Sequence, residues 1–366
     1  MHVLLLAYSI PIEITKSRLT MRFENITPNS IYTLSPEVEP FFGALSLLDG
    51  EDFHKECSNI FGADKISDLK RRYRFLFETY DAVKDLSLWN ISDIMLDIFD
   101  EDFSIDRYYK YTISIPDDER IFKIVEWSYF GKITQKDIAS AITDDKALDK
   151  LFSKVGESCK GFLGLSTFIR QNRKFIDEFF SLAKALDTPS LKKAVKAHKS
   201  DFENFKQSLI KDLETDEPLT CSQELMGKTF HNRGPYEIFY FVPSLLLPRK
   251  AIRLFYENGT KHNKQILFCN ILEAQNNMQD AVTALKSLSD ETRYQILKVL
   301  SQKGPMKGQD IVKELGLAPS TISHHMTGLK ESGLITEEPV KTSKYYGISR
   351  NRINDIFDLV KKDLNL

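Results

Sequence analysis

The chain contains little cysteine, with four residues in 366. Cys57, Cys159, Cys221 and Cys269 lie far apart, which excludes a disulfide framework and a CxxC metal signature. Scattered free thiols are typical of a reducing compartment, so we expect a cytoplasmic protein.

A long hydrophobic run is also absent. The first residues, MHVLLLAYSIPIE, include one short apolar stretch without a positively charged leader, and this stretch is too short to span a bilayer. We therefore expect no membrane partner and predict a buried strand at Val3–Tyr8.

No strong excess of either charge is present. The formal net charge is −2, and residues 279–366 carry 13 Lys and Arg against 11 Asp and Glu. Such a mildly basic C-terminal part does not by itself indicate a nucleic-acid binder. Any function of that kind has to be argued from the positions of individual side chains.

Common catalytic motifs are missing. The chain has no P-loop, G-x-G-x-x-G, H-E-x-x-H or G-x-S-x-G motif. His54 and Cys57 have the spacing of half a metal site, but no partner pair can be identified. We therefore expect a protein that is not an enzyme, and we assign no catalytic residue, no metal ligand and no cofactor.

The first two thirds of the chain are predicted to be mainly helical. A strand is expected at Leu19–Asn25, followed by a helix with Ser35 as N-cap and Pro36 at its first position. From there to about residue 230, apolar residues repeat at three-to-four spacing, which indicates a series of helices.

Between residues 236 and 271 the pattern predicts strands, with a hairpin signal at Glu257-Asn258-Gly259. A helix from about Leu272 to Leu288 is expected to follow with no flexible linker. We therefore predict an α+β protein. Residues 1–275 form a large, mainly helical domain with a small β-sheet of peripheral strands, and residues 276–366 form a C-terminal domain.

Two short helices around a tight turn are predicted in the C-terminal domain. They follow a helix that Asp290 caps and that Gly304 and Pro305 end. GQDIVKELG predicts a short helix ended by Gly316, and PSTISHHMTGLKESG predicts a second helix ended by Gly333. This arrangement is the geometry of a helix-turn-helix motif.

The second of these helices has two chemically different faces. At about 100° per residue, Ile322, Met326 and Leu329 share one narrow sector and should pack on the domain. The other side is polar and free of large apolar groups, which suits a helix in the DNA major groove. We predict DNA contacts from Ser320, Thr321, Ser323, His324, Thr327 and Lys330.

LITEEP and KYYGIS then predict two strands of a hairpin, or wing. Lys341 and Lys344 lie near its tip and are predicted to reach DNA phosphates. Arg293, near a helix start, has two readings of equal weight: it binds a phosphate, or it holds the fold together.

The closing segment NRINDIFDLVKKDL predicts an amphipathic helix. Its apolar face is larger than a small domain normally covers alone, so we predict a dimer face shared with the helix at residues 279–288. The residues of this face are Ile353, Ile356, Phe357, Val360 and Leu364.

LSDETRYQIL, DIVKELGLAPSTISHHMTGLKESGLI and KYYGIS occur in the order and spacing of the ArsR family, and the last quarter of the chain resembles these winged helix-turn-helix regulators. The resemblance implies a homodimer on a near-palindromic site in double-stranded DNA, and repression relieved by a signal. Two positions depart from the family pattern. Ala318 stands where a Ser usually precedes the recognition helix, and Lys341 with Thr342 replaces a Gly-Arg pair in the wing.

The family's metal-sensing patterns are not matched. Lys307 and Gln309 occupy the positions of two cysteine ligands, and the last helix has aspartates at 355, 358 and 363 but no histidine. The adjacent His324 and His325 lack the i, i+3 or i, i+4 spacing of metal ligands on a helix. We therefore expect a signal other than a metal.

The role of the large domain stays open at this stage. It contains 37 of the 41 aromatic residues, which fits either an apolar ligand site or a well-filled core. The basic run at residues 70–74 is interpreted as a solvated helix face. The leading prediction is a transcriptional regulator with a small-molecule or protein effector; the alternatives are an enzyme fused to a DNA-binding domain and a dimerisation platform.

Overall fold

The computed structural model describes residues 22–49, 55–83, 86, 88–126, 131–230, 233–255, 263–272, 277–340 and 343–364. The strand predicted at Val3–Tyr8 and the hairpin signal at residues 257–259 lie outside these ranges. Buried side chains form two clusters before residue 273 and one after residue 276. None of the described helices has the length and apolar character needed to cross a membrane. The predicted α+β class is confirmed.

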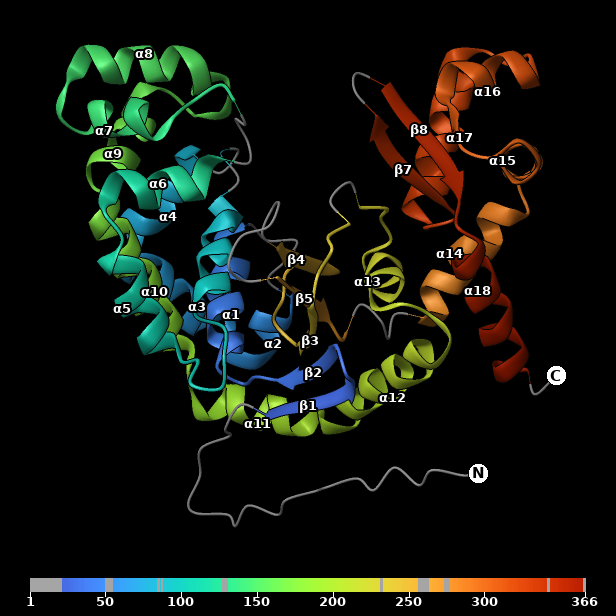
Figure 1. Ribbon diagram of the computed structural model, residues 1–366, viewed down its shortest axis with the longest axis horizontal. Helices are drawn as coiled ribbons and strands as arrows, with labels where there is room; N and C mark the ends of the chain where they lie inside the picture. Colours follow the sequence, from blue (N-terminus) through green and yellow to red (C-terminus); the bar gives the residue numbers. More distant parts are fainter. Residues whose placement is uncertain are drawn as a thin grey trace.

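A five-stranded mixed sheet brings together segments from both ends of the large domain (Figure 1). β2, β3 and β5 are parallel, while β1 and β4 pair antiparallel at the two edges. Ser30 is thus paired with Phe239, more than 200 positions later in the chain. In the order β1-β2-β3-β5-β4, the strands are Arg22–Thr27, Ser30–Leu34, Ile238–Ser244, Lys264–Asn270 and Ala251–Phe255.

Both faces of the inner strands β3 and β5 are buried. On β3, Val242 belongs to the large helical cluster, whereas Phe239 and Phe241 belong to a second cluster with Leu209 and Cys221. Strands covered on both faces give continuous apolar runs, as in IFYFVPS and QILFC. The strands predicted between residues 236 and 271 are confirmed as β3, β5 and β4. The expectation of peripheral strands is wrong for β3 and β5, which lie inside the sheet with helical clusters on both faces, whereas β4 forms an edge.

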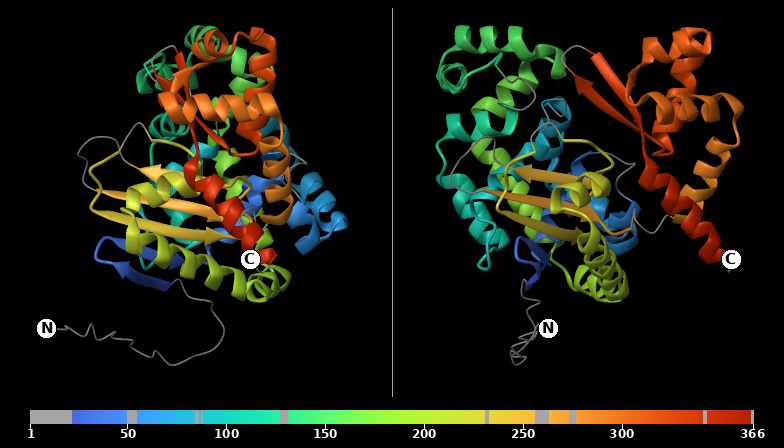
Figure 2. Two further views of the ribbon diagram at one scale, coloured as in Figure 1. Left: turned by 90° about the vertical axis from the view of Figure 1, so that its right-hand side faces the viewer. Right: turned by 45° about the vertical axis from the view of Figure 1, so that its right-hand side comes forward.

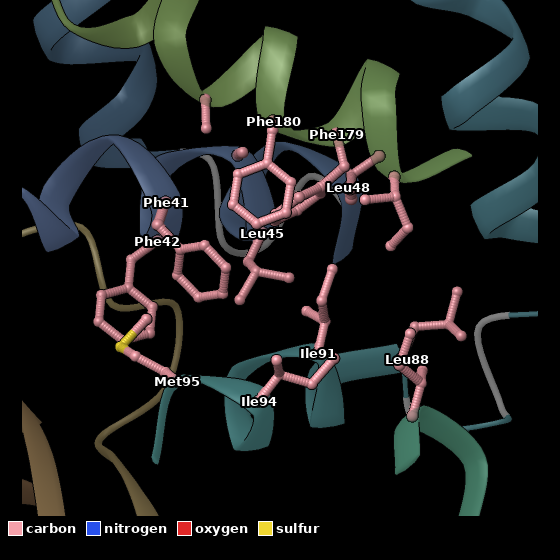
Figure 3. Packing of buried hydrophobic residues seen from close by; sticks show 14 of the residues in the cluster. Phe41, Phe42, Leu45, Leu48, Leu88, Ile91, Ile94, Met95, Phe179 and Phe180 are labelled. Atoms are coloured by element: carbon pink, nitrogen blue, oxygen red, sulfur yellow. The ribbon is translucent and has the colours of Figure 1, made fainter. Parts of the chain in front are cut away.

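α1 (Val38–Asp49) and α10 (Asn172–Leu186) form the centre of the large helical cluster (Figure 3). The Phe41 ring meets Phe179 at 5.4 Å between centroids, and Phe42 meets Phe268 of β5 at 4.9 Å. α1 begins at Val38, two positions later than predicted, because the chain first makes a turn in which the Val38 N–H donates to the Ser35 carbonyl.

The remaining elements of the large domain confirm the predicted helical region. They include capped helices such as α7, where Thr134 and Asp137 form a capping box. The elements are α2 (Lys55–Phe61), α3 (Ala63–Arg72), α4 (Arg74–Val83), η3 (Leu88–Asp97), α5 (Ile105–Ser114), α6 (Asp117–Val125), α7 (Gln135–Thr143), α8 (Asp145–Val155), η5 (Gly156–Ser158), α9 (Phe162–Arg170), α11 (Pro189–Ala197), α12 (Lys199–Thr215) and α13 (Pro218–Met226).

The C-terminal elements form a group with its own core (Figure 2). They are α14 (Asn277–Leu288), α15 (Glu291–Lys303), β6 (Met306–Lys307), α16 (Gly308–Leu315), α17 (Pro319–Glu331), β7 (Ile335–Val340), β8 (Ser343–Ile348) and α18 (Arg350–Asp363), with strand order β6-β8-β7. The predicted joining helix is wrong at its start: Leu272 lies in a turn and α14 begins at Asn277. The predicted boundary at residues 275 and 276 lies outside the described residues.

Candidate DNA-binding site

Local capping signals fix the helices around the predicted turn. The Asp290 carboxylate accepts a hydrogen bond of 2.8 Å from the Arg293 N–H and caps α15, which ends at Gly304. Gly316, with φ of 65°, ends α16 in the left-handed conformation that favours glycine. α17 then begins with Pro319 at its first turn, behind Ala318, whose side chain makes no cap. α16 and α17 therefore meet as predicted for a helix-turn-helix.

The two predicted faces of α17 are present. Ile322, Met326 and Leu329 are buried in the C-terminal core, where they hold the helix on the domain. The opposite face carries hydroxyl, imidazole and ammonium groups and leaves them open to solvent. The exposed residues are Ser320, Thr321, Ser323, His324, Thr327 and Lys330. The structure thus brings six of the nine predicted DNA-contacting residues together on one surface.

The two adjacent histidines have different surroundings. His324 is exposed, whereas His325 is largely buried with its Nδ1 atom 3.4 Å from the Asp290 carboxylate. This contact is not a hydrogen bond, and the Nδ1 atom has no hydrogen-bond partner among the described residues. His325 therefore belongs to the junction of α15 and α17 and not to the exposed surface.

The wing is an antiparallel hairpin of β7 and β8. Lys344 is exposed on β8, while Lys341 lies outside the described residues. The Lys344 Nζ lies 2.9 Å from Oε1 of Glu337 on β7, and the Lys330 Nζ of α17 lies 3.1 Å from Oε2 of the same carboxylate. The hydrogen bond from Lys344, and to a lesser extent that from Lys330, lowers the pKa of Glu337 against the effect of burial.

Glu337 was missed by the sequence analysis. It stands opposite Tyr346 in the hairpin, which makes it the diagonal neighbour of Lys344. Strand register was the signal that could have revealed this pair. Its contact with Lys330 depends on how the wing folds against α17, which no local pattern gives.

Arg293 is not part of the exposed surface. Its guanidinium group donates a hydrogen bond of 3.0 Å to the buried Ser287 hydroxyl of α14 and packs against Gly328 of α17. These contacts correspond to the second of the two readings, in which Arg293 holds the fold together. The phosphate contact of Arg293 stays a prediction.

α14 and α18 pack against each other, and exposed apolar side chains lie on α14, on α18 and directly after the end of α18. Ile356 is buried between the elements of the C-terminal core, but 47% of Phe357 and 64% of Leu364 are exposed, as is 38% of Val282 on α14. Exposed large apolar residues from two neighbouring helices are typical of an interface. We call Val282, Phe357 and Leu364 the apolar face.

The helical core of the large domain is tightly filled. A small cavity lined by aliphatic side chains of α6, α7, α8 and α9 and their neighbours has a volume of about 10 Å³, no more than the smallest space that one ordered water molecule needs. The aromatic residues of Figure 3 therefore pack against one another and fill the core. Among the described residues, no group of three His, Cys, Asp or Glu side chains is placed to hold a metal ion; His54 lies outside them.

Comparison with known proteins finds sequence relatives of the C-terminal part of the chain. Residues 290–337 match the family described as bacterial regulatory protein, arsR family. An uncharacterized HTH-type transcriptional regulator of Methanocaldococcus jannaschii is 35% identical over 82 residues, which are 22% of this chain and 92% of that protein. The arsenical resistance operon repressor of Staphylococcus aureus is 32% identical over 74 residues, 20% of this chain and 70% of that protein. The transcriptional repressor SdpR of Bacillus subtilis is 29% identical over 80 residues, 22% of this chain and 88% of that protein.

Proposed function

Because the chain belongs to the arsR family and is a DNA-binding transcriptional regulator, we propose that it acts as a homodimeric repressor on a near-palindromic operator. In a two-fold dimer the recognition helices enter successive major grooves, so the half-sites are expected about one helical turn apart. The repressor names of two relatives support the sign of regulation. The cytoplasmic location expected from the cysteine pattern is part of the same proposal.

The single observation that carries this proposal is the exposed polar face of α17, held in place by its buried apolar face. We assign base and phosphate contacts to Ser320, Thr321, Ser323, His324, Thr327 and Lys330. Lys344 and Lys341 of the wing are assigned to backbone phosphates. The apolar face of α14 and α18 is the proposed dimer interface.

Footprinting of the full-length protein on genomic DNA tests this proposal. The expected result is protection of a site with two-fold symmetry that survives an excess of non-specific competitor. Absence of any protected site at low salt, where phosphate contacts are strongest, would sink the proposal. Protection of a single half-site would refute the dimer and leave DNA binding intact.

We propose that the large domain is regulatory and not catalytic. A winged helix-turn-helix domain with its dimer helices needs only about 90 residues, so three quarters of the chain serve another purpose. An effector, either a small molecule or a protein, would change operator affinity by binding one arrangement of the dimer better than another. The absence of the family's cysteine and histidine ligands at residues 307 and 309 and in the last helix supports a signal other than a metal.

Operator release under different additions tests this regulatory role. Full-length protein bound to its operator is titrated with metabolite fractions, with protein fractions and with stoichiometric zinc, cadmium and arsenite. Release by a fraction and not by the metals is expected. Release at micromolar metal would overturn the non-metal proposal, and turnover of a metabolite by the protein would favour the alternative of a fused enzyme.

A further inference from the structure

One carboxylate connects the recognition helix to the wing. Glu337 on β7 accepts hydrogen bonds from Lys344 of β8 through Oε1 and from Lys330 of α17 through Oε2. Each oxygen atom thus holds a different ammonium group. Only 19% of the Glu337 side chain is exposed, whereas the two lysine side chains are more than half exposed.

The same two ammonium groups are the cations assigned above to DNA phosphates. A phosphate and a carboxylate both present anionic oxygens that accept charge-assisted hydrogen bonds from lysine. Resting on the proposed DNA binding, we infer that Glu337 occupies, in the free protein, the position of a DNA phosphate between α17 and the wing. DNA has to displace the Glu337 carboxylate from Lys330 and Lys344 in order to bind both.

Displacement is energetically feasible because both lysine side chains are more than half exposed, and ion pairs made by exposed, flexible side chains are weak. Its cost is the same for every DNA sequence, since phosphate contacts carry no direct sequence information. The hydrogen bonds from the two lysines keep the pKa of Glu337 below its usual range, so the carboxylate is charged and competes at neutral pH. Glu337 therefore weakens binding to specific and non-specific DNA alike. As a result, base contacts contribute a larger share of the binding free energy at a specific site.

Glu337→Gln tests this competition in the full-length protein. Gln keeps the size of the side chain but removes the charge that holds the lysines. Binding is measured on the footprinted fragment and on a random-sequence duplex across a series of salt concentrations. We expect roughly tenfold tighter binding to both at low salt, and a salt dependence steeper by about one unit of log K against log salt.

Glu331→Gln is the matched control. Glu331 is exposed on the last turn of α17 next to Lys330 and forms no ion pair among the described residues. The Glu331→Gln variant measures how much DNA affinity changes when one negative charge near the DNA is removed but no lysine is freed from an ion pair. If Glu337→Gln increases DNA affinity no more than Glu331→Gln does, the inference is wrong. It is also wrong if Glu337→Gln weakens DNA binding, because Glu337 would then hold the two lysines in the orientation that binds DNA.

A third comparison isolates the lysines. In a protein that carries both Lys330→Gln and Lys344→Gln, the Glu337→Gln change should not increase DNA affinity further. An increase in this background would contradict competition between Glu337 and DNA for the two lysines. Thermal unfolding of each variant checks that the wing and α17 remain folded. If wild-type protein binds neither DNA probe, the proposed function fails; if it binds both and Glu337→Gln behaves like the control, only this inference fails.

Discussion

The guanidinium group of Arg293 occupies the space that a side chain at Gly328 would need. A methyl group at position 328 would lie 2.5 Å from Nη2 and 2.7 Å from Cζ of Arg293. Arg293 also donates a hydrogen bond to Ser287, so one side chain connects α14 of the proposed dimer interface with α17 of the proposed DNA-binding surface. The glycine in the middle of the recognition helix is explained by this close approach.

Gly328→Ala should therefore destabilise the C-terminal domain by about 1 kcal/mol, because the Arg293 guanidinium must move away and lose its hydrogen bond to the buried Ser287 hydroxyl, which outweighs the better helix propensity of Ala. In an Arg293→Ala background the sign should reverse, and Gly328→Ala should stabilise by up to about 1 kcal/mol. Denaturant unfolding of the four proteins in this cycle measures the coupling. The same effect of Gly328→Ala in both backgrounds would contradict the steric account.

The exposed face of α17 predicts two kinds of DNA-binding defect. His324→Ala and Thr327→Ala should weaken operator binding by about 1–3 kcal/mol for each lost base contact, while binding to random DNA changes little. Lys344→Ala should weaken binding to both and reduce the salt dependence by about one unit. Titrations of both probes at several salt concentrations separate these cases. Equal losses on operator and random DNA for His324→Ala would exclude a base contact by that residue.

Much of the C-terminal domain could be predicted because its signals are local. Asp290 caps α15 from the position directly before it, and Gly316 ends α16 because it adopts a positive φ angle. Ile322 is buried because it lies on the same side of α17 as Met326 and Leu329. Each of these depends on residues within about one helical turn. The α17 face and the wing strands were predicted correctly for the same reason.

The rest depends on contacts between distant parts of the chain. Pairing of β2 with β3 joins positions more than 200 residues apart. The strand at β3 could be recognised from its own residues, but β2 at Ser30–Leu34 was not predicted, nor was the place of β3 between two helical clusters. The direction of the Arg293 side chain depends on Ser287 and Gly328 from two other helices. The periodicity of apolar residues carries no information about such partners. The sequence therefore could not decide whether Arg293 binds a phosphate or stabilises the fold.

The apolar face predicts a variant that separates the protomers. Phe357→Asp would place a carboxylate in the proposed interface, where burial of an unpaired charge costs several kcal/mol, so self-association should weaken by roughly a hundredfold or more. Leu163→Asp on α9 is the control, since Leu163 is 78% exposed on the large domain. Sedimentation equilibrium measures both. A Phe357→Asp protein that remains as dimeric as the control would place the interface elsewhere.

Glu39 predicts a pH dependence of the large domain. Its carboxylate is 1% exposed and accepts hydrogen bonds from the Leu245 and Leu246 N–H groups and from the Ser244 hydroxyl, which ties α1 to the end of β3. Burial raises the pKa of Glu39 to about 7, and these hydrogen bonds and the charge of His198 only partly oppose the shift. The folded protein therefore binds a proton at Glu39 that the unfolded chain releases at lower pH.

A raised carboxyl pKa contributes stability that is fully present below the unfolded pKa of about 4.5 and is lost as pH rises through about 7. The unfolding free energy of wild type minus that of Glu39→Gln should thus fall between pH 4.5 and 7.5, by up to about 3 kcal/mol. The Gln amide faces a backbone N–H group and lowers stability at every pH, but it adds no titration. Denaturant unfolding followed by circular dichroism measures the difference, with Glu331→Gln as the exposed control. A constant difference across this range would mean that Glu39 is ionised in the folded protein and that its three hydrogen bonds outweigh burial.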